Sequence, residues 1–318
     1  MAILAIANVG GHLRELVELL PRMNLDGEVI WMTNDGPQSR SLLVDAEVVH
    51  LPYARARSVR DAYRNAAIAR RALRSTEIAV AVTTGSSLAV SVLPIASSRG
   101  ASLHYIESAT RIDGPSLSGR LVRWLPRVNL YSQSESWAND RWQFRGTVFD
   151  GFDVEFVGPC EPRKVVVTVG TSTFSGFRRL IVKLLDLLPP DCEVLWQTGS
   201  TDLAGLDIDG HESLLATELE DAIREADLVI AHAGAGSALT ALACGRYPIL
   251  VPRDPAHGEH VDAHQFEIAD RLGSAGLAEV SRVEQLTSDT LMRAAGGRVK
   301  RVGDQVPFDL ARDGRDHH

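Results

Sequence analysis

Four short turns rich in glycine and small polar residues follow apolar runs in this sequence. In such a turn, where a strand leads into a helix, free backbone N–H groups and the positive end of the helix dipole face one point, which suits a phosphate. The glycine spacing is neither G-x-G-x-x-G nor that of a P-loop, so one turn alone also fits simple packing of helix on sheet. Four together favour an anion-binding edge. They lie at Asn8–Glu15, Val167–Ser172, Gln197–Gly199 and Leu228–Ser237.

The last of these turns has the clearest pattern. Gly234 and Gly236 would let the backbone approach a ligand, and Ser237 is expected to cap the helix that follows. A second strand and the polar stretch His257–Gln265 come next. His260 and His264 would share a helix face, but the metalloprotease pattern needs Glu at position 261, where the chain has Val. We therefore expect hydrogen bonds to a polar ligand and no metal site.

Two titratable groups in the first half could move a proton. His12, beside Gly10 and Gly11, needs no large pKa shift to act as a base near pH 7, although packing against its own helix is an equal alternative. Glu107 and Arg111 follow another predicted strand, and a structural ion pair is the commoner explanation for them.

Composition excludes some classes of function. The formal net charge of -8 argues against nucleic acid as a partner, although seven arginines against one acid lie between Arg55 and Arg74. A second basic cluster spans Arg111–Arg127. These runs fit solvated helix faces or, as a minority interpretation, an anionic membrane or acceptor. Three widely spaced cysteines give no metal motif or disulfide framework and fit a reducing cytoplasm, and no run approaches the ~20 apolar residues of a membrane span.

Strands and helices alternate along the chain, which predicts an α/β protein with parallel sheets. We expect one domain over residues 1–157, a linker over 158–163 and a second domain over 164–318. Ligands of such sheets bind beyond the carboxyl ends of the strands, so the expected site is the cleft between the domains. Strands are expected at 3–7, 29–32, 48–51, 78–82, 102–106, 128–131, 165–169, 193–197, 228–231, 248–251 and 277–280, and helices at 12–20, 59–74, 88–97, 117–125, 174–188, 218–226, 237–244 and 260–272.

Both halves resemble one enzyme. Val167–Phe174, His232–Ser237 and His264-Gln265 look like the catalytic subunit of the eukaryotic transferase that adds the second N-acetylglucosamine to the dolichol-linked precursor. The stretches 10–15, 33–35, 105–108, 111 and 116–119 resemble its membrane-recruiting partner, so the chain looks like the two fused. Bacterial exopolysaccharide transferases and the peptidoglycan N-acetylglucosaminyltransferase are similar.

The resemblance implies a GT-B fold and an inverting, metal-independent glycosyltransferase without cofactor. It would move a sugar from a UDP-sugar to an acceptor hydroxyl, with a lipid-linked saccharide of cell-surface polysaccharide assembly as the expected acceptor. His12 would be the catalytic base, with Glu107 second, on the acceptor side with Gly10, Gly11, Glu15, Ser108 and Arg111. The donor set would be Gly170, Thr171, Ser172, Gln197, Gly199, His232, Gly234, Ala235, Gly236, Ser237, Thr240, His257, Glu259, His260, His264 and Gln265; relatives commonly have Glu where this chain has Thr240.

Other functions stay open on the sequence. A glycosyltransferase acting on a soluble metabolite, a nucleotide-sugar epimerase or hydrolase, and a non-catalytic UDP-sugar-binding scaffold would use the same two domains. The donor sugar, the acceptor and the oligomeric state have no sequence signature here. A cytoplasmic location, with peripheral contact to the membrane through the arginine-rich N-terminal surface, is the expectation.

Overall fold

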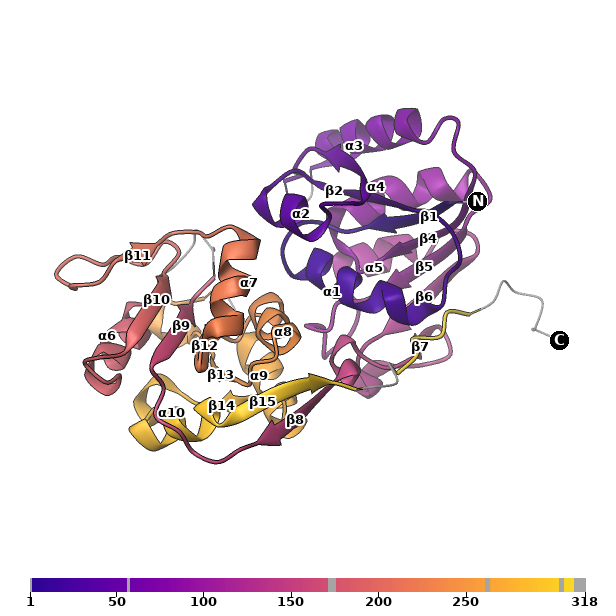
Figure 1. The fold of residues 1–318 in the computed structure, drawn as a ribbon. Coiled ribbons are helices and arrows are strands. Elements are labelled where there is room, and N and C mark those ends of the chain that lie inside the picture. The colour runs from indigo at the N-terminus through magenta and orange to yellow at the C-terminus, as the bar shows by residue number, and fades with distance from the viewer. Residues whose placement is uncertain (1, 56–57, 171–175, 261–263, 303–305, 312–318) are drawn as a thin grey trace. The chain divides into compact units, whose positions relative to one another are not determined.

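The computed structural model describes residues 2–55, 58–170, 176–260, 264–302 and 306–311 (Figure 1). The chain forms two compact units. Unit 1 comprises residues 1–150 and the C-terminal segment from 305, and unit 2 comprises residues 151–304. Each unit is a sheet with helices packed on it, so the predicted pair of α/β domains is confirmed.

Unit 1 is built on a seven-stranded parallel sheet in the order β3-β2-β1-β4-β5-β6-β7. Runs such as Ala2–Ile6 and Ser102–Ile106 are buried along their whole length, as expected for strands covered on both faces. The elements are β1 (Ala2–Ile6), α1 (Gly11–Leu19), β2 (Val29–Asn34), α2 (Pro37–Leu42), β3 (Glu47–Leu51), α3 (Val59–Ala72), β4 (Ile78–Thr83), α4 (Ser86–Ser97), β5 (Ser102–Ile106), α5 (Leu117–Val122), β6 (Val128–Ser132) and β7 (Trp142–Phe144), with 3-10 turns at Leu20–Met23, Glu135–Trp137 and Val148–Gly151.

Unit 2 has a six-stranded parallel sheet in the order β11-β10-β9-β12-β13-β14. A separate antiparallel pair joins β8 to β15. The elements are β8 (Phe152–Phe156), β9 (Lys164–Thr168), α6 (Arg178–Leu187), β10 (Glu193–Gln197), β11 (Gly210–His211), α7 (Ala216–Glu225), β12 (Leu228–His232), α8 (Ala235–Ala243), β13 (Pro248–Val251), α9 (His264–Ser274), β14 (Glu279–Val280), α10 (Ser288–Ala295) and β15 (Gly297–Arg301), with 3-10 turns at Pro255–His257 and Val283–Gln285.

Each sheet has one point at which the strand order reverses. In unit 1 the chain leaves β1 toward β2 and leaves β4 toward β5, so the reversal lies between β1 and β4. In unit 2 it lies between β9 and β12. Loops diverge beyond the carboxyl ends of the strands at such a switch point, and open α/β sheets bind their ligands there. The fold thus selects one candidate position in each unit.

The domain boundaries differ from the expected ones. The structure divides the chain at Asp150 and Gly151 rather than after residue 157, because β8 pairs with β15 of unit 2. The C-terminal segment returns to unit 1, where Phe308 is buried against Tyr131 and its backbone N–H donates to the Arg22 carbonyl. A short segment without regular secondary structure carries no sequence pattern that would reveal such a return.

None of the helices that the structure describes is both long and apolar enough to cross a lipid bilayer.

Candidate functional site

Each switch point holds a histidine anchored to the neighbouring strand. In unit 1, His12 follows β1 and its Nδ1 lies 2.9 Å from the Thr84 carbonyl oxygen, just beyond β4. The Thr84 hydroxyl donates in return to the His12 carbonyl at 2.7 Å. A carbonyl only accepts, so Nδ1 carries the proton and the neutral ring keeps a lone pair on Nε2. Among the described residues Nε2 has no hydrogen-bond partner.

The charge state of His12 suits a base. Burial lowers its pKa, and the bond to Thr84 and the nearby Glu107 carboxylate partly offset that effect. The imidazole is therefore neutral at pH 7 with an unused acceptor nitrogen, which is the form that removes a proton. Of the two sequence interpretations of His12, the geometry favours the base over simple helix packing.

Glu107 is placed differently from that expectation. It is only 1% exposed, and its Oε2 accepts hydrogen bonds from the backbone N–H and hydroxyl of Ser116 at 2.9 and 3.0 Å. Oε1 accepts from the Ser108 N–H at 3.3 Å. Burial raises the pKa of Glu107, while these bonds hold it down. The carboxylate thus fixes the start of α5 and acts on His12 by its charge, and its role as second candidate base stays a prediction.

Glu15 is also structural. The side chain is 0% exposed and accepts hydrogen bonds from the Ser108 hydroxyl at 2.7 Å, the Ala109 N–H at 3.1 Å and the Gln133 amide at 3.0 Å. It ties α1 to the turn after β5, and its predicted contact with the acceptor stays a prediction. Arg111 donates through Nε to the Gly114 carbonyl within that turn rather than pairing with Glu107.

The glycine turn before α1 is held by a residue that the sequence pattern did not reveal. Gln38 of α2 accepts from the Gly10 N–H at 2.5 Å and donates to the Gly10 carbonyl at 3.2 Å. Gly10 has φ +104°, which side chains rarely adopt, so glycine is needed there. Gly11 begins α1. The Gly10 N–H that was expected to face a phosphate is therefore satisfied by Gln38.

In unit 2, His232 ends β12 and its ring lies between two glycines. A Cβ on Gly170 would stand 2.6 Å from the ring Cε1, and one on Gly234 would overlap Nε2. Nδ1 lies 3.4 Å from the Thr168 carbonyl oxygen at the end of β9. These two glycines make room for the imidazole, which gives their positions a reason beyond the general freedom of a turn. Nε2 has no hydrogen-bond partner among the described residues.

The electrostatic surroundings of His232 are cationic. Burial and the Arg253 guanidinium lower its pKa to about 4, with a smaller contribution from His260, while the bond to Thr168 raises it. Arg253 follows β13, is 1% exposed, and donates from Nη2 to the Val169 carbonyl at 2.5 Å. No sequence motif marked this arginine. The only available signal was a charged residue directly after the apolar run 248–252.

The polar stretch after β13 mainly supports this corner. Gln265 of α9 is 7% exposed, and its Oε1 accepts from the Arg253 backbone N–H at 2.9 Å. Glu259 receives two hydrogen bonds from Arg179, at 3.0 and 2.9 Å, and one from the Asp254 N–H. Glu259 thereby links α6 to this loop. The side chain of His257 is exposed, and that of His260 is half-buried.

Other predicted donor residues also have internal partners. Gln197 accepts from the Thr168 hydroxyl at 2.5 Å and is 4% exposed, so it joins β10 to β9. Gly199 turns the chain with φ +55°. Thr240 donates to the Gly236 carbonyl one turn back in α8, which uses the hydroxyl at the position where relatives commonly have Glu.

The start of α8 corrects one expectation. The helix begins at Ala235 with Gly234 as N-cap and no side-chain cap, so Ser237 lies in the first turn and does not cap it. Among the described residues no side chain caps this first turn, which is compatible with the predicted anion site. Thr171 and Ser172 lie outside the described residues, and so does the side chain of His264, although α9 begins there.

A second turn of unit 1 was missed by the sequence interpretation. Thr84, Gly85 and Ser86 connect β4 to α4, and Asn8 accepts from the Ser86 hydroxyl and from the Leu88 N–H at its Oδ1. Gly85 and Ser86 have φ values of +107° and +78°. The short run of small polar residues after an apolar strand was the signal for this turn.

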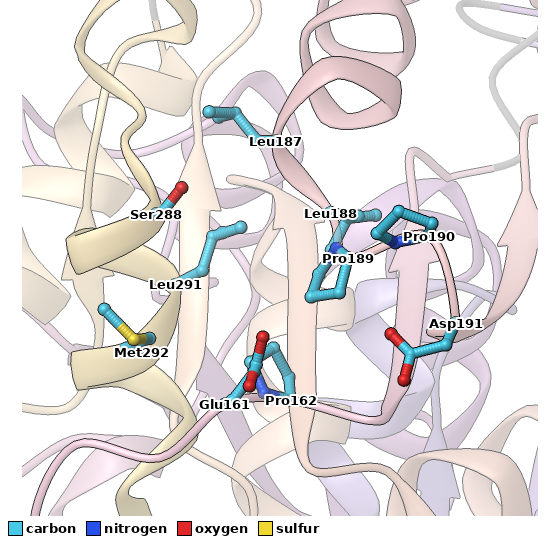
Figure 2. Close-up of a pocket in the computed structure, with 10 residues that line it drawn as sticks. All are labelled: Glu161, Pro162, Leu187, Leu188, Pro189, Pro190, Asp191, Ser288, Leu291 and Met292. Carbon is cyan, nitrogen blue, oxygen red and sulfur yellow. The ribbon is translucent and has the colours of Figure 1, made fainter.

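Among the described residues, no group of three or more His, Cys, Asp or Glu side chains could hold a metal ion. A cavity of about 340 Å³ lies at the opposite, amino-terminal edge of the unit 2 sheet (Figure 2). Its lining comes from the loops before β9 and β10 and from α10, and includes Pro162, Pro189, Leu291 and Met292. It therefore belongs to neither switch point.

Residues 164–295 match the glycosyltransferase family 28 C-terminal domain. A curated relative is the UDP-N-acetylglucosamine–N-acetylmuramyl-(pentapeptide) pyrophosphoryl-undecaprenol N-acetylglucosamine transferase of Synechococcus sp. (strain CC9902), 30% identical over 140 residues. The match covers 42% of this chain and 39% of the relative, so the aligned part is well under half the length of that protein.

Solved structures resemble the chain over nearly its whole length. MurG of Acinetobacter baumannii has a TM-score of 0.54 and 17% identity, covering 91% of this chain and 88% of MurG. The glycosyltransferase SnogD of Streptomyces nogalater has a TM-score of 0.57 and 19% identity, covering 93% and 92%. A Listeria monocytogenes protein assigned as a UDP-N-acetylglucosamine 2-epimerase has a TM-score of 0.56 and 10% identity, covering 91% and 93%.

At identities this low, the likeness to solved structures establishes the fold alone. The family match concerns the second half of the chain. Both agree with the sheet topology and with the motif-based resemblance. The protein thus has the GT-B fold of two Rossmann-like units, and its residues 164–295 match the model of the glycosyltransferase family 28 C-terminal domain.

Proposed function

We propose that the protein is an inverting glycosyltransferase that transfers a sugar from a UDP-sugar to an acceptor hydroxyl. The observation that carries this proposal is the free Nε2 of His12 at the unit 1 switch point, in a chain whose second unit matches a glycosyltransferase domain. In the proposed division of labour, unit 1 holds the acceptor and unit 2 holds the nucleotide sugar.

The chemistry assigns one proton transfer and one displacement. Nε2 of His12 takes the proton of the acceptor hydroxyl as its oxygen attacks the anomeric carbon, and the bond from that carbon to the diphosphate oxygen breaks. The configuration at the anomeric carbon is inverted because the acceptor oxygen attacks and the diphosphate departs on opposite faces of that carbon. The leaving UDP gains negative charge, which the free amides of the first turn of α8 stabilise. Removing one such donor typically costs about 10²–10³ in rate.

A metal-independent mechanism is part of the proposal. We expect transfer to continue unchanged after treatment with EDTA and extensive dialysis. Loss of turnover on chelation, with recovery on adding Mg²⁺ or Mn²⁺, would contradict it. Steady-state rates with and without added divalent cation make this comparison directly.

A lipid-linked saccharide is the proposed acceptor, on the cytoplasmic face of a membrane. The family resemblance and the printed name of the Synechococcus relative support this class. In unit 1, Leu117, Leu121 and Trp124 are exposed along α5 and just after it, with Arg120 beside them and Arg123 stacked on Trp124. Exposed apolar and aromatic side chains interleaved with arginines suit an anionic lipid surface.

Vesicle sedimentation tests the membrane contact. The protein should bind vesicles that contain phosphatidylglycerol, and Trp124→Ala with Leu121→Ser should weaken binding without lowering the melting temperature. Val182→Ser with Leu185→Ser, exposed positions on α6 of unit 2, is the matched control. Equal binding by all three proteins would contradict a contact through α5.

Donor class and reaction are tested separately. UDP should raise the melting temperature more than GDP or dTDP, because a ligand that binds only the folded state stabilises it by mass action. With a UDP-sugar supplied, UDP should be released only when an acceptor is present.

Product analysis also covers the alternatives. Release of free sugar without acceptor would indicate a hydrolase, and isomerised donor would indicate an epimerase, which the similarity to the Listeria fold keeps as the second candidate. Transfer to a soluble metabolite but not to lipid-linked saccharide would change the acceptor class. Tight UDP binding with no turnover across a broad acceptor panel would favour a non-catalytic scaffold.

A further inference from the structure

Arg253 is a buried cation beside the unit 2 switch point. It follows β13, the strand next to β12, and only 1% of its surface is exposed. Its Nη2 donates to the carbonyl of Val169, the residue directly before Gly170. The guanidinium thus lies next to the turn that follows β9, on the same strand edge as the start of α8.

The side chain is held by neutral partners. Besides Val169, it has the ring of Phe177 at 5.9 Å, while the Gln265 amide oxygen fixes its backbone. Its Nε is buried and has no hydrogen-bond partner. A charged group with an unused donor in the interior costs free energy unless an opposite charge is near.

No carboxylate forms an ion pair with Arg253 among the described residues. The acid whose charge acts on it is Glu259, and both oxygens of Glu259 accept hydrogen bonds from Arg179, with a further one from the Asp254 N–H. Arg179 also pairs with Glu284, so the two carboxylates at this corner are bonded to Arg179 and neither is bonded to Arg253. The charge of Arg253 can therefore favour an anion beneath the glycine turns.

His232 does not supply that charge. Its ring lies between Gly170 and Gly234, and the charged or titratable described groups that act on it are Arg253 and His260. With a pKa lowered to about 4, the imidazole is neutral at pH 7. Because Nδ1 faces the Thr168 carbonyl, neutral His232 offers the lone pair of Nε2, which accepts hydrogen bonds and repels a phosphate oxygen.

We propose that Arg253, rather than His232, is the positive charge that holds the diphosphate of the nucleotide sugar, acting from beneath the turn at Val169 and Gly170. Neutral His232 then accepts a hydrogen bond from a hydroxyl or N–H of the same ligand. Arg253 is a positioning residue, since its burial keeps it from direct contact. This inference rests on the proposed nucleotide-sugar site and names the residue that makes this site prefer a negatively charged ligand.

A ligand series of increasing charge tests the assignment. Uridine, UMP and UDP are titrated calorimetrically into the wild-type protein, Arg253→Met, Arg253→Lys and Arg293→Met. Arg293 is an exposed arginine of α10 paired with Glu279, so its variant removes a cation of the same unit away from the switch point. All variants are first compared by circular dichroism and melting temperature.

The expected result is a loss that grows with phosphate number. Arg253→Met should bind UDP at least about tenfold more weakly than the wild type and uridine about equally well, because a charge several ångströms away acts only on the phosphates. Arg253→Lys should retain most of the gain from uridine to UDP, and Arg293→Met should match the wild type. Equal weakening of uridine and UDP, or no weakening of either, would overturn the proposal.

NMR supplies a measurement that survives a folding defect. In wild-type protein labelled at arginine and histidine, UDP should shift the Arg253 Nε–H resonance, while uridine leaves it in place. The His232 ring should remain neutral down to a pH near 5. An Arg253 Nε–H resonance that does not shift when UDP binds would refute the assignment to Arg253. Failure of the wild type to bind UDP at all would instead refute the proposed nucleotide-sugar site.

Discussion

The two switch points use the same device with opposite charges. Each places a histidine beyond a strand end, with Nδ1 against a threonine carbonyl across the reversal: Thr84 for His12 and Thr168 for His232. The charged neighbour in unit 1 is the carboxylate of Glu107, and in unit 2 it is the guanidinium of Arg253. A carboxylate raises the pKa of an imidazole and a guanidinium lowers it, so the first ring suits the proposed proton transfer and the second lies beside the proposed anion site.

The largest expected effect comes from removing the unit 1 imidazole. His12→Ala should lower kcat by about 10²–10⁴, the usual contribution of a general base, while the affinity for UDP stays unchanged. Steady-state kinetics at saturating acceptor and calorimetric titration of UDP measure the two quantities. Near wild-type turnover would remove His12 from the mechanism and break the comparison between the two rings.

Substitution of the glycines beside the two histidine rings should destabilise the protein more than substitution of other glycines with positive φ. Gly170→Ala and Gly85→Ala combine a positive φ with a contact: the new Cβ would meet the His232 ring in one case and the Tyr105 hydroxyl, at 2.9 Å, in the other. Gly276→Ala and Gly100→Ala have the same sign of φ and open space around the Cβ.

The open positions should lose about 1–2 kcal/mol of unfolding free energy from backbone strain alone. The positions beside the rings should lose more, Gly170→Ala should also weaken UDP binding, and Gly85→Ala should lower kcat. Chemical denaturation and the two activity readouts separate these effects. Equal destabilisation at all four positions would mean that the His232 ring and the Tyr105 hydroxyl move aside freely.

The smallest expected effect is a shift along the pH axis. The Glu107 carboxylate raises the pKa of His12 against the effect of burial, so Glu107→Gln should lower that pKa further. A base works only when unprotonated, and activity rises as pH increases through its pKa. The acidic limb of the kcat/KM profile should therefore move to lower pH, with Asp113→Asn as an exposed control in the same loop. A limb that moves to higher pH would contradict the coupling of Glu107 to His12.

The elements were predictable because parallel strands buried on both faces read as apolar runs. Ser102–Ile106 and Pro248–Val251 coincide with their expected bounds. The pair β8 and β15 was missed because β15 has a single apolar side chain, Val299, and the alternating run Phe152–Phe156 lies next to turn residues typical of a linker. Pairing between segments so distant in sequence has no local signature.

The site was predictable in position and less so in roles. Glycine turns identified both strand edges, since backbone freedom leaves a compositional signal. Burial leaves none: Glu15, Glu107 and Gln197 share residue types with ligand-binding groups, and only the fold reveals that their oxygens are used internally. Arg253 escaped notice for the converse reason, because charged residues are mostly exposed and a single arginine after a strand suggests a surface.

The return of the C-terminal segment to unit 1 has a consequence for protein engineering. Residues 151–304 are an insertion between two parts of one unit, bounded by the junctions at 150/151 and 304/305. A chimaera that exchanges unit 2 must therefore replace a segment with two junctions, keeping Phe308 and its partner Tyr131 from the same parent. A single crossover in the connector 157–163 would instead combine the N-terminal part of unit 1 from one parent with the C-terminal segment from the other. The mismatch would fall where Phe308 packs against Tyr131.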